Sequence, residues 1–323
     1  DEEALVGEGR RNATLAVPLV RMLREHVARS SKDAAKDVHR GATSQDVLDT
    51  ATALCLRPCL EEADRALDGA VRSLARRARE HRATPMLART LLQPALAIPA
   101  GLKIARWAAA LAADRERLAD AQAGALALQL GGPVGALDGM DGKGPAVRHR
   151  MALALGLADA PEWQSHRNGW IDLLDRVGLV IATCGKIARD VALLGQAEVG
   201  EMLEAPPGED GGRSSAMPHK RNPVACARAL AAAVRMPGLL ATVHAAAMGE
   251  HERALGGWQA ELAAVPEIAA ALGGALDFLD TIAASLVVDP ARMRENLARL
   301  DDASPVDPRA VDEVLAALAP HLA

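Results

Sequence analysis

The sequence predicts an all-α fold, a bundle of long helices. Half of its 323 residues are hydrophobic, mostly Ala and Leu, so the chain can bury a large core and favours helices over sheets. Only 2% are aromatic, and no segment alternates convincingly between polar and apolar residues, so no substantial sheet is expected. Apolar residues instead recur every three or four positions, the pattern of helices that pack on other helices.

The clearest helical seam begins at Trp170 and ends at Leu194. Its apolar positions, separated by three or four residues, are Trp170, Leu173, Val177, Val180, Cys184, Ile187, Val191 and Leu194. A helix over about 169–202 would span roughly 50 Å, which is too long for a compact small domain and suits an extended bundle. Four further helices are expected, over 61–82, 102–123, 224–248 and 259–288.

Proline and glycine mark the connections between these helices. Arg-Ala-Thr-Pro at 82–85 ends one helix, and Gln93-Pro94 and Ile98-Pro99 indicate an irregular connection. A glycine-rich loop follows at 131–145, and Pro206-Pro207-Gly208 ends the longest helix. Long loops within a rigid bundle are where chemistry tends to occur.

Charge and cysteine content predict a soluble cytoplasmic protein. The net charge of −5 argues against a broad nucleic-acid-binding surface. The four cysteines show neither zinc spacing nor a disulfide framework, and the nine histidines form no close-spaced metal-binding set. The acidic first residues lack a signal-peptide pattern, and the longest uncharged run, 121–137, contains Gly-Gly-Pro and makes a poor membrane span.

The strongest candidate site reads GGRSSAMPHKRNP and begins at Gly211. Its two glycines permit hinge motion, and Asn222 followed by Pro223 suits a helix N-terminus. Backbone N–H groups at that terminus, together with Lys220, would favour a carboxylate or a developing negative charge. The alternative is a flexible loop with an ordinary helix cap.

From Ser214 this run resembles the signature of the fumarase/aspartase superfamily, Ser-Ser-x-Met-Pro-x-Lys-x-Asn-Pro. The resemblance implies a loop that closes over a dicarboxylate. It implies that Ser214 is the catalytic base, which removes a proton from the carbon next to a carboxylate. Lys220 and Asn222 would bind the substrate carboxylate, and Ser215 and Met217 would shape the loop.

A second block, HRGATSQD from His39, resembles the superfamily's His-x-Gly-x-Thr-Ser-x-Asp block. The resemblance implies that Thr43 and Ser44 hydrogen-bond a substrate carboxylate and that His39 lines the site as a candidate catalytic residue. The alternative is a helix start in which Thr43 and Asp46 form a capping-box-like pair. Both can hold, because a capped helix N-terminus also binds anions.

A third block, RTLLQPA from Arg89, resembles the superfamily's Thr-x-x-Gln-x-Ala block, which implies that Gln93 contacts the substrate. The alternative is a polar break between helices. Several lyases of the superfamily carry a histidine general acid at the position of Leu91. A leucine cannot transfer protons.

Within the superfamily, HERALGGWQAE from His251 and the stretch 93–107 resemble the 3-carboxy-cis,cis-muconate cycloisomerase branch. That branch adds a substrate carboxylate across a double bond to form a carboxymuconolactone, without metal or organic cofactor. The alternative is a lyase that releases fumarate from a substituted succinate, such as adenylosuccinate or nitrosuccinate. Asn12 and Leu91 stand where adenylosuccinate lyases usually carry histidines, which weakens the purine-pathway alternative. A catalytically silent helical scaffold is the third hypothesis.

The resemblance covers roughly residues 11–300 and implies a homotetramer whose sites combine loops from three subunits. It divides the chain into a remnant of an N-terminal helical domain (1–38), a central long-helix bundle (39–288) and a shortened C-terminal helical segment (289–323). The expected ligand is a small di- or tricarboxylate. No nucleic-acid or membrane partner is expected.

Overall fold

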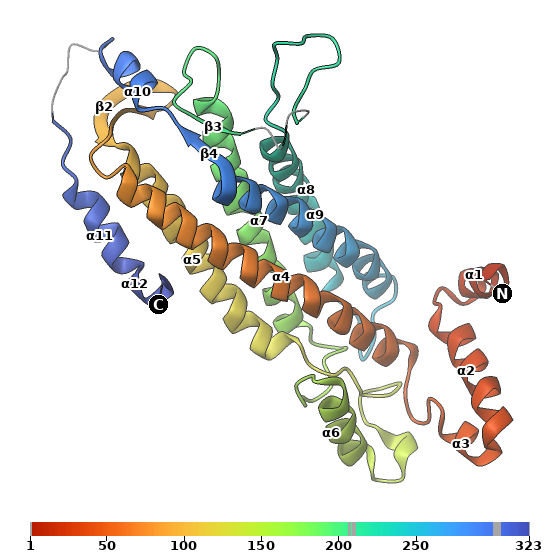
Figure 1. Cartoon of the computed structure of the whole chain (residues 1–323). Coiled ribbons are helices and arrows are strands. Elements are labelled where there is room, and N and C mark those ends of the chain that lie inside the picture. Colours follow the sequence, from red (N-terminus) through yellow and green to blue (C-terminus); the bar gives the residue numbers. More distant parts are fainter. Residues whose placement is uncertain (1, 206–207, 209–210, 300–304, 323) are drawn as a thin grey trace. The chain divides into compact units, whose positions relative to one another are not determined.

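The computed structural model describes residues 2–205, 208, 211–299 and 305–322, and helices dominate it (Figure 1). In chain order the elements are α1 (Glu2–Asn12), α2 (Ala16–Ser30), α3 (Lys32–Asp37), α4 (Ser44–Glu80), β1 (Pro85–Thr90), β2 (Gln93–Pro99), α5 (Ala100–Ala125), the 3₁₀ helix η1 (Asp138–Met140), α6 (Gly144–Leu155), α7 (Asn168–Leu194), β3 (Met202–Glu204), α8 (Val224–Ala246), α9 (Gly257–Ser285), β4 (Leu286–Val288), α10 (Pro290–Leu297), α11 (Arg309–Ala317) and α12 (Ala319–Leu322). The predicted all-α class is confirmed. Within the described residues, sheet is limited to two antiparallel ribbons, β1–β2 and β3–β4.

Tertiary contacts divide the chain into two compact units. The first contains Asp1–Pro58, Ala121–Asp172 and Thr242–Leu262, and the second contains the remaining three segments, Cys59–Asp120, Leu173–Ala241 and Ala263–Ala323. These units are defined by contacts between residues in space and each combines segments far apart in the sequence. The division of the chain into three consecutive segments, expected from the sequence, stays a prediction.

The second unit is a helix bundle joined by polar contacts between helices. Arg115 of α5 donates to Asp64 Oδ1 at 2.6 Å and to Asp68 Oδ1 at 2.5 Å, both on α4. Trp107 of α5 donates its indole N–H to Asp190 of α7 at 3.0 Å. These contacts fix the rotation of each helix, while the apolar seams fill the space between them.

The α7 seam confirms the predicted helix, although the helix ends earlier than expected. All eight seam residues from Trp170 to Leu194 are at most 5% exposed. The prediction that the helix continues to Met202 is wrong. Gly195 follows the last helical residue, and an added Cβ there would lie 3.2 Å from both Leu203 Cβ and the Val191 carbonyl oxygen. Beyond it the chain turns, and the Glu201 N–H donates to the Leu194 carbonyl oxygen at 2.9 Å, which satisfies a carbonyl of the last helical turn.

The predicted helix over 61–82 is the second half of a longer one. α4 begins at Ser44, inside the second motif, and contains Pro58. Proline removes one backbone hydrogen bond from a helix interior, which explains why the sequence pattern suggested a later start. The expected irregular connection after α4 is an antiparallel hairpin, in which Pro85 pairs with Pro99 and Thr90 pairs with Gln93.

The first unit contains α1, α2, α3 and α6 and has its own apolar cluster. The buried members of this cluster are Leu128, Leu130, Leu137, Met140, Ala152 and Leu157. Two of them, Leu137 and Met140, come from the glycine-rich stretch, which forms an ordered part of the unit around η1 and α6. This packing supports the loop that faces the second motif.

Candidate active site

The signature segment forms a loop whose two ends are joined by backbone contacts. We call this junction the neck of the loop. The Asn222 N–H donates to the Gly212 carbonyl oxygen at 2.7 Å, and Arg213 and Arg221 form an isolated antiparallel bridge. The residues between them are therefore held as one unit in front of α8. This arrangement keeps Ser214 and Lys220 on the same short loop.

Ser214 lies half-buried in this loop and its hydroxyl oxygen accepts two backbone N–H groups. They come from Met217 at 3.1 Å and from Ala216 at 3.3 Å. Two N–H dipoles aimed at one oxygen stabilise negative charge on it, as in an oxyanion hole. The geometry therefore suits Ser214 for proton transfer. Ser215 is exposed and Met217 is 41% exposed, so both lie on the surface of the loop.

Asn222 does not cap α8, contrary to the expectation from the sequence. Within the described residues, the carboxylate of Glu204 takes this role, accepting the N–H groups of Ala225 at 3.0 Å and Cys226 at 2.8 Å. A carboxylate is the favoured partner of a helix N-terminus. These two α8 amides are therefore occupied, and the candidate anion-binding groups are the side chains of the loop. Lys220 is exposed and its backbone N–H donates to the Met217 carbonyl oxygen at 3.0 Å.

Asn222 instead lines a cavity of about 220 Å³ in the second unit. Its other lining residues include Leu203, Glu204, Arg221 and Pro223. The half-buried amide of Asn222 can donate and accept hydrogen bonds, and Arg221 adds a positive charge. The cavity is therefore large enough for part of a small carboxylate. Asn222 and Arg221 are the candidate partners for such a group, because the Glu204 carboxylate in the same lining is already engaged by α8 amides.

Replacing Gly212 with alanine should disable this loop without unfolding the protein. Gly212 has φ = +68°, and an added Cβ would lie 2.4 Å from the Asn222 carbonyl oxygen. The neck of the loop must then open, and we expect kcat/KM to fall by roughly tenfold or more through misplacement of Ser214 and Lys220.

Gly142 provides the matched control for this variant, because it has φ = +74° with nothing within 4 Å of an added Cβ. Gly142→Ala should cost only the ~1–2 kcal/mol of left-handed strain and leave turnover unchanged. Steady-state kinetics and thermal unfolding of both variants check this. Equal losses of kcat/KM in the two variants would show that the closed neck does not contribute to catalysis.

The second motif lies at the start of α4 in the first unit. The Thr43 N–H donates to Asp46 Oδ2 at 2.9 Å, so the capping pair expected from the sequence is present. Asp46 also accepts the backbone N–H groups of Gly131 at 2.9 Å and Gly132 at 3.0 Å. One buried carboxylate thereby ties the motif to the glycine-rich loop. Thr43 is 8% exposed and Ser44 is the first residue of the helix.

His39 precedes this helix start with φ = +63° and lies half-buried. Burial lowers the pKa of its imidazole, the nearby Asp46 carboxylate opposes that change, and Arg24 adds to it. His39 lines two cavities of the first unit, of about 660 and 530 Å³. A neutral imidazole at a cavity wall can accept a proton or a hydrogen bond.

Arg253 is a site residue that the motifs did not reveal. Its guanidinium donates to Thr43 Oγ1 at 2.6 Å and to the Pro133 carbonyl oxygen at 3.2 Å. It therefore brings a positive charge to the hydroxyl that the resemblance assigns to a substrate carboxylate. Arg253 belongs to the HERALGGW stretch, whose resemblance to one branch of the superfamily does not by itself assign Arg253 a role.

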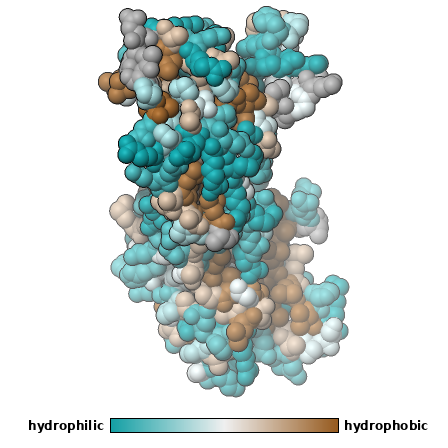
Figure 2. Space-filling view, turned by 60° about the vertical axis from the view of Figure 1, so that its left-hand side comes forward, coloured by the Kyte–Doolittle hydropathy of each residue, from teal (hydrophilic) through white to brown (hydrophobic). Residues whose placement is uncertain are grey.

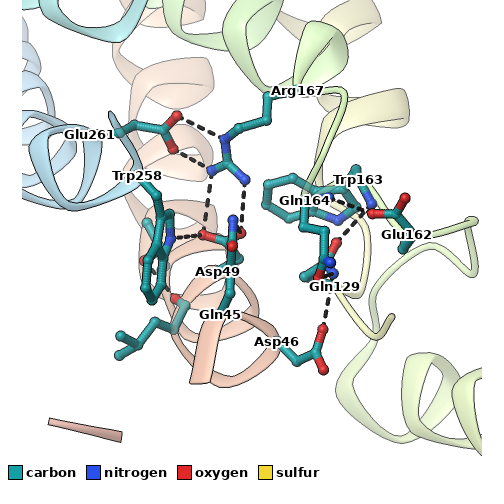
Figure 3. Close-up of polar contacts among 12 residues, drawn as sticks. Gln45, Asp46, Asp49, Gln129, Glu162, Trp163, Gln164, Arg167, Trp258 and Glu261 are labelled. Carbon is teal, nitrogen blue, oxygen red and sulfur yellow. Dashed lines mark hydrogen bonds and ion pairs between the residues drawn. The ribbon is translucent and has the colours of Figure 1, made fainter. Parts of the chain in front are cut away.

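A buried ion cluster lies next to the second motif (Figure 3). Arg167 lies between two carboxylates, donating to Asp49 Oδ2 at 2.8 Å and to Glu261 Oε2 at 2.8 Å. Trp258 adds an indole N–H to Asp49 Oδ1 at 3.1 Å. Burial alone would lower the pKa of Arg167, but its bonds to Glu261 and Asp49 raise it on balance. Asp49 lies one turn of α4 after the motif, so the cluster fixes that end of the helix.

The third motif forms the tip of the β1–β2 hairpin in the second unit. Gln93 is exposed and pairs with Thr90. The two residues between them, Leu91 and Leu92, have φ of +52° and +63° and are 96% and 75% exposed. Bulky residues rarely adopt this left-handed conformation, and such strain is often found at functional sites.

The predicted site residues therefore fall into two groups. His39, Thr43 and Ser44 belong to the first unit, whereas Gln93 and the loop from Ser214 to Asn222 belong to the second. Each group is organised within its own unit by buried carboxylates. Among the described residues, no three His, Cys, Asp or Glu side chains gather as a metal site.

Comparison with known proteins identifies the class. A model of the lyase family matches residues 10–238. The chain belongs to this lyase family, within the fumarase/aspartase superfamily. The 3-carboxy-cis,cis-muconate cycloisomerase of Bradyrhizobium diazoefficiens is 47% identical over 299 residues, which cover 92% of this chain and 66% of that protein. The chain thus spans slightly less than two thirds of this relative's length.

Two further relatives bear on the choice of reaction. The crystal structure of 3-carboxy-cis,cis-muconate lactonizing enzyme from Pseudomonas putida aligns with a TM-score of 0.85 and 35% identity, over 99% of this chain and 73% of that one. The nitrosuccinate lyase of Streptomyces davaonensis is 40% identical, over 92% of this chain and 64% of its own length. The predicted superfamily and its helical fold are confirmed.

Proposed function

We propose that this chain carries the catalytic loops of a 3-carboxy-cis,cis-muconate cycloisomerase. The observation that carries the proposal is the Ser214 hydroxyl, which accepts N–H groups from Ala216 and Met217 on the loop that also bears Lys220 and Asn222. This is the arrangement that a proton transfer next to a carboxylate requires. The choice of substrate follows from the 47% identical cycloisomerase.

The proposed reaction forms one C–O bond and one C–H bond. A substrate carboxylate oxygen attacks a carbon of the double bond, and the π electrons move toward the adjacent carboxylated carbon as an enolate-like dianion. The Ser214 hydroxyl then donates its proton to this carbon, which completes the lactone, and the resulting alkoxide takes up a proton from water. In lactone opening the same oxygen removes that proton. Lys220 and Asn222 stabilise the dianion, because fixed donors act most strongly where charge develops.

A fumarate-releasing lyase is the second candidate, favoured by the 40% identical nitrosuccinate lyase. Its first step is the same: a base removes the proton next to a carboxylate. The leaving group then departs as a stable anion that needs little protonation. Leu91 at the hairpin tip is compatible with such a reaction, because a leucine cannot act as a general acid.

A substrate panel separates these candidates. Purified protein is incubated with 3-carboxy-cis,cis-muconate, nitrosuccinate and adenylosuccinate, and lactone and fumarate are quantified. Lactone without fumarate supports the proposal, and fumarate from either succinate supports the lyase. The absence of both products in folded protein would indicate a silent scaffold.

We further propose a homotetramer with sites shared between subunits, in the cytoplasm. The length and hydropathy of α8 and α9 would allow either to cross a membrane, but half of the most apolar stretch of α9 is buried, as in a core helix. In α8 only 28% of that stretch is buried, and Val234 is 73% exposed. Hydrophobic patches also interrupt the polar surface in Figure 2. Such surfaces favour a subunit interface.

Sedimentation velocity should therefore show a tetramer whose activity is lost on dilution or on charging the exposed face of α8. Val234→Glu should dissociate the assembly and abolish turnover, because a buried interface charge is strongly unfavourable. Leu153→Glu, at a 70% exposed position on α6, is the control and should change neither. A fully active monomer would contradict the proposal.

In the proposed tetramer, Leu91, which is 96% exposed in the single chain, should line the substrate pocket without transferring protons. Leu91→Ala removes apolar contact, so we expect a higher KM and an unchanged pH dependence of turnover. A pH–rate profile measured for wild type and variant checks this. Loss of an ionisation from the variant's profile would show that this interpretation of Leu91 is wrong.

A further inference from the structure

Strand β3 lies between two buried carboxylates whose roles the motifs do not specify. Glu201 precedes the strand and is 0% exposed, and Glu204 ends it at 6% exposed. Side chains of an extended chain alternate between its faces, so positions three residues apart point to opposite sides. Their Cα atoms are nevertheless only ~10 Å apart. The two carboxylates can therefore hold two different elements at a short, fixed separation.

Glu201 holds the hairpin that carries Gln93. Arg89 of β1 forms two parallel bonds with this carboxylate, Nη1 to Oε2 at 2.8 Å and Nη2 to Oε1 at 2.9 Å. Asn296 of α10 donates to Oε1 at 2.8 Å. Arg89 directly precedes Thr90, the partner of Gln93 across the hairpin. The bidentate pair fixes direction as well as distance, so it sets where the hairpin tip lies.

Glu204 holds the exit of the signature loop. Its two oxygens accept the Ala225 and Cys226 N–H groups of α8, which begins two residues after Asn222. Burial raises the pKa of the Cys226 thiol, and a hydrogen bond and the charge of Glu204 raise it further. The thiol therefore stays neutral, and Glu204 is the anion that neutralises this helix end.

Backbone hydrogen bonds keep the strand between the two carboxylates rigid. β3 pairs with β4 over all three of its residues. Beyond the pairs, Asp289 N–H donates to the Glu201 carbonyl oxygen at 2.9 Å, and Ala205 N–H donates to the Ser285 carbonyl oxygen at 3.2 Å. Both ends of the short strand are thus anchored, and neither carboxylate can shift without breaking ribbon contacts.

We propose that Glu201 and Glu204 are positioning residues that set the spacing between the Gln93 hairpin and the Lys220–Asn222 end of the signature loop. The inference rests on the proposed function, because it takes both elements as parts of one substrate-binding surface. Glu204 also lines the Asn222 cavity, but both of its oxygens are engaged by α8 amides. Each acts through the element it holds, so the two should affect different kinetic constants.

The test compares two nearly isosteric variants. Glu201→Gln weakens the hold on the hairpin, and we expect KM to rise about tenfold with kcat within about twofold, because Gln93 contributes binding only. Glu204→Gln loosens the loop that carries Ser214 and Lys220, and kcat should fall roughly ten- to hundredfold. Glu198→Gln, at an exposed position on the same segment, is the control and should match wild type.

Amide hydrogen exchange provides a readout that needs no substrate. Glu204→Gln should accelerate exchange at Ala225, Cys226 and the loop before them, and Glu201→Gln should do so in the hairpin. Local acceleration together with the split between KM and kcat supports the proposal. Folded variants with normal kinetics would overturn it. The two proposals can fail separately. If wild type made no lactone, the proposed function would be wrong. If amide exchange stayed unchanged near both substitutions, the positioning role would be wrong.

Discussion

Ser214→Ala should lower turnover by at least ~10²-fold, the usual scale for a lost general acid–base group, while substrate binding stays largely intact. The hydroxyl oxygen that accepts the Ala216 and Met217 N–H groups is the group placed to exchange the proton. Alanine leaves the loop neck in place, since the Asn222 bond to Gly212 involves backbone only. Turnover and dissociation constants of the purified variant check the prediction.

Two neighbouring variants serve as controls for this result. Ser215→Ala should be milder, because Ser215 is exposed and is assigned only to loop shape. Lys220→Arg keeps the charge but changes the shape of the hydrogen-bond donor, so we expect turnover to be lost in this variant as well. If Ser215→Ala proved as damaging as Ser214→Ala, with Ser214→Ala near normal, the base would have to be Ser215 or His39.

Arg167→Met should produce the largest loss of stability, about 3 kcal/mol or more, because it leaves two buried carboxylates without their cation. The side chains of Arg167, Asp49 and Glu261 are 6%, 2% and 2% exposed. Methionine preserves most of the volume, so the effect isolates the lost charge. Urea unfolding, followed by circular dichroism, measures the free energy of unfolding.

Arg76→Met is the matched control for Arg167→Met. Arg76 pairs with Glu80 one turn away on α4, and both side chains are about half exposed, at 58% and 46%. Water already solvates these charges, so the urea concentration at the midpoint of unfolding should barely change. A similar small change in Arg167→Met would mean that the buried cluster contributes little to the fold.

The helices could be predicted from the sequence because their signal is local. The spacing of eight apolar residues predicts the buried face of α7, and all eight of these residues are buried. The signature loop was equally visible, since all its functional groups lie within nine residues of one another. Short-range pattern and local structure agree in both cases.

The supporting residues could not be predicted, because their partners are far away along the chain. Arg253 reaches Thr43 across 210 positions, and Glu204 caps a helix that begins 20 residues later. A carboxylate that caps a distant helix has no sequence spacing to reveal it. The preference for Asn222 as the cap followed local rules and was wrong because a better acceptor comes from β3.

The left-handed Leu91–Leu92 turn limits how this protein could be stabilised by redesign. A two-residue hairpin turn of this kind favours Asn-Gly, and the backbone angles at these positions would accept that pair with less strain. A redesign guided by backbone preference would therefore change both leucines and raise the melting temperature of the protein. It would also erase the apolar tip next to Gln93. Gains in thermal stability at this turn should accordingly come at the expense of activity, and libraries selected for heat resistance alone should lose the leucines first.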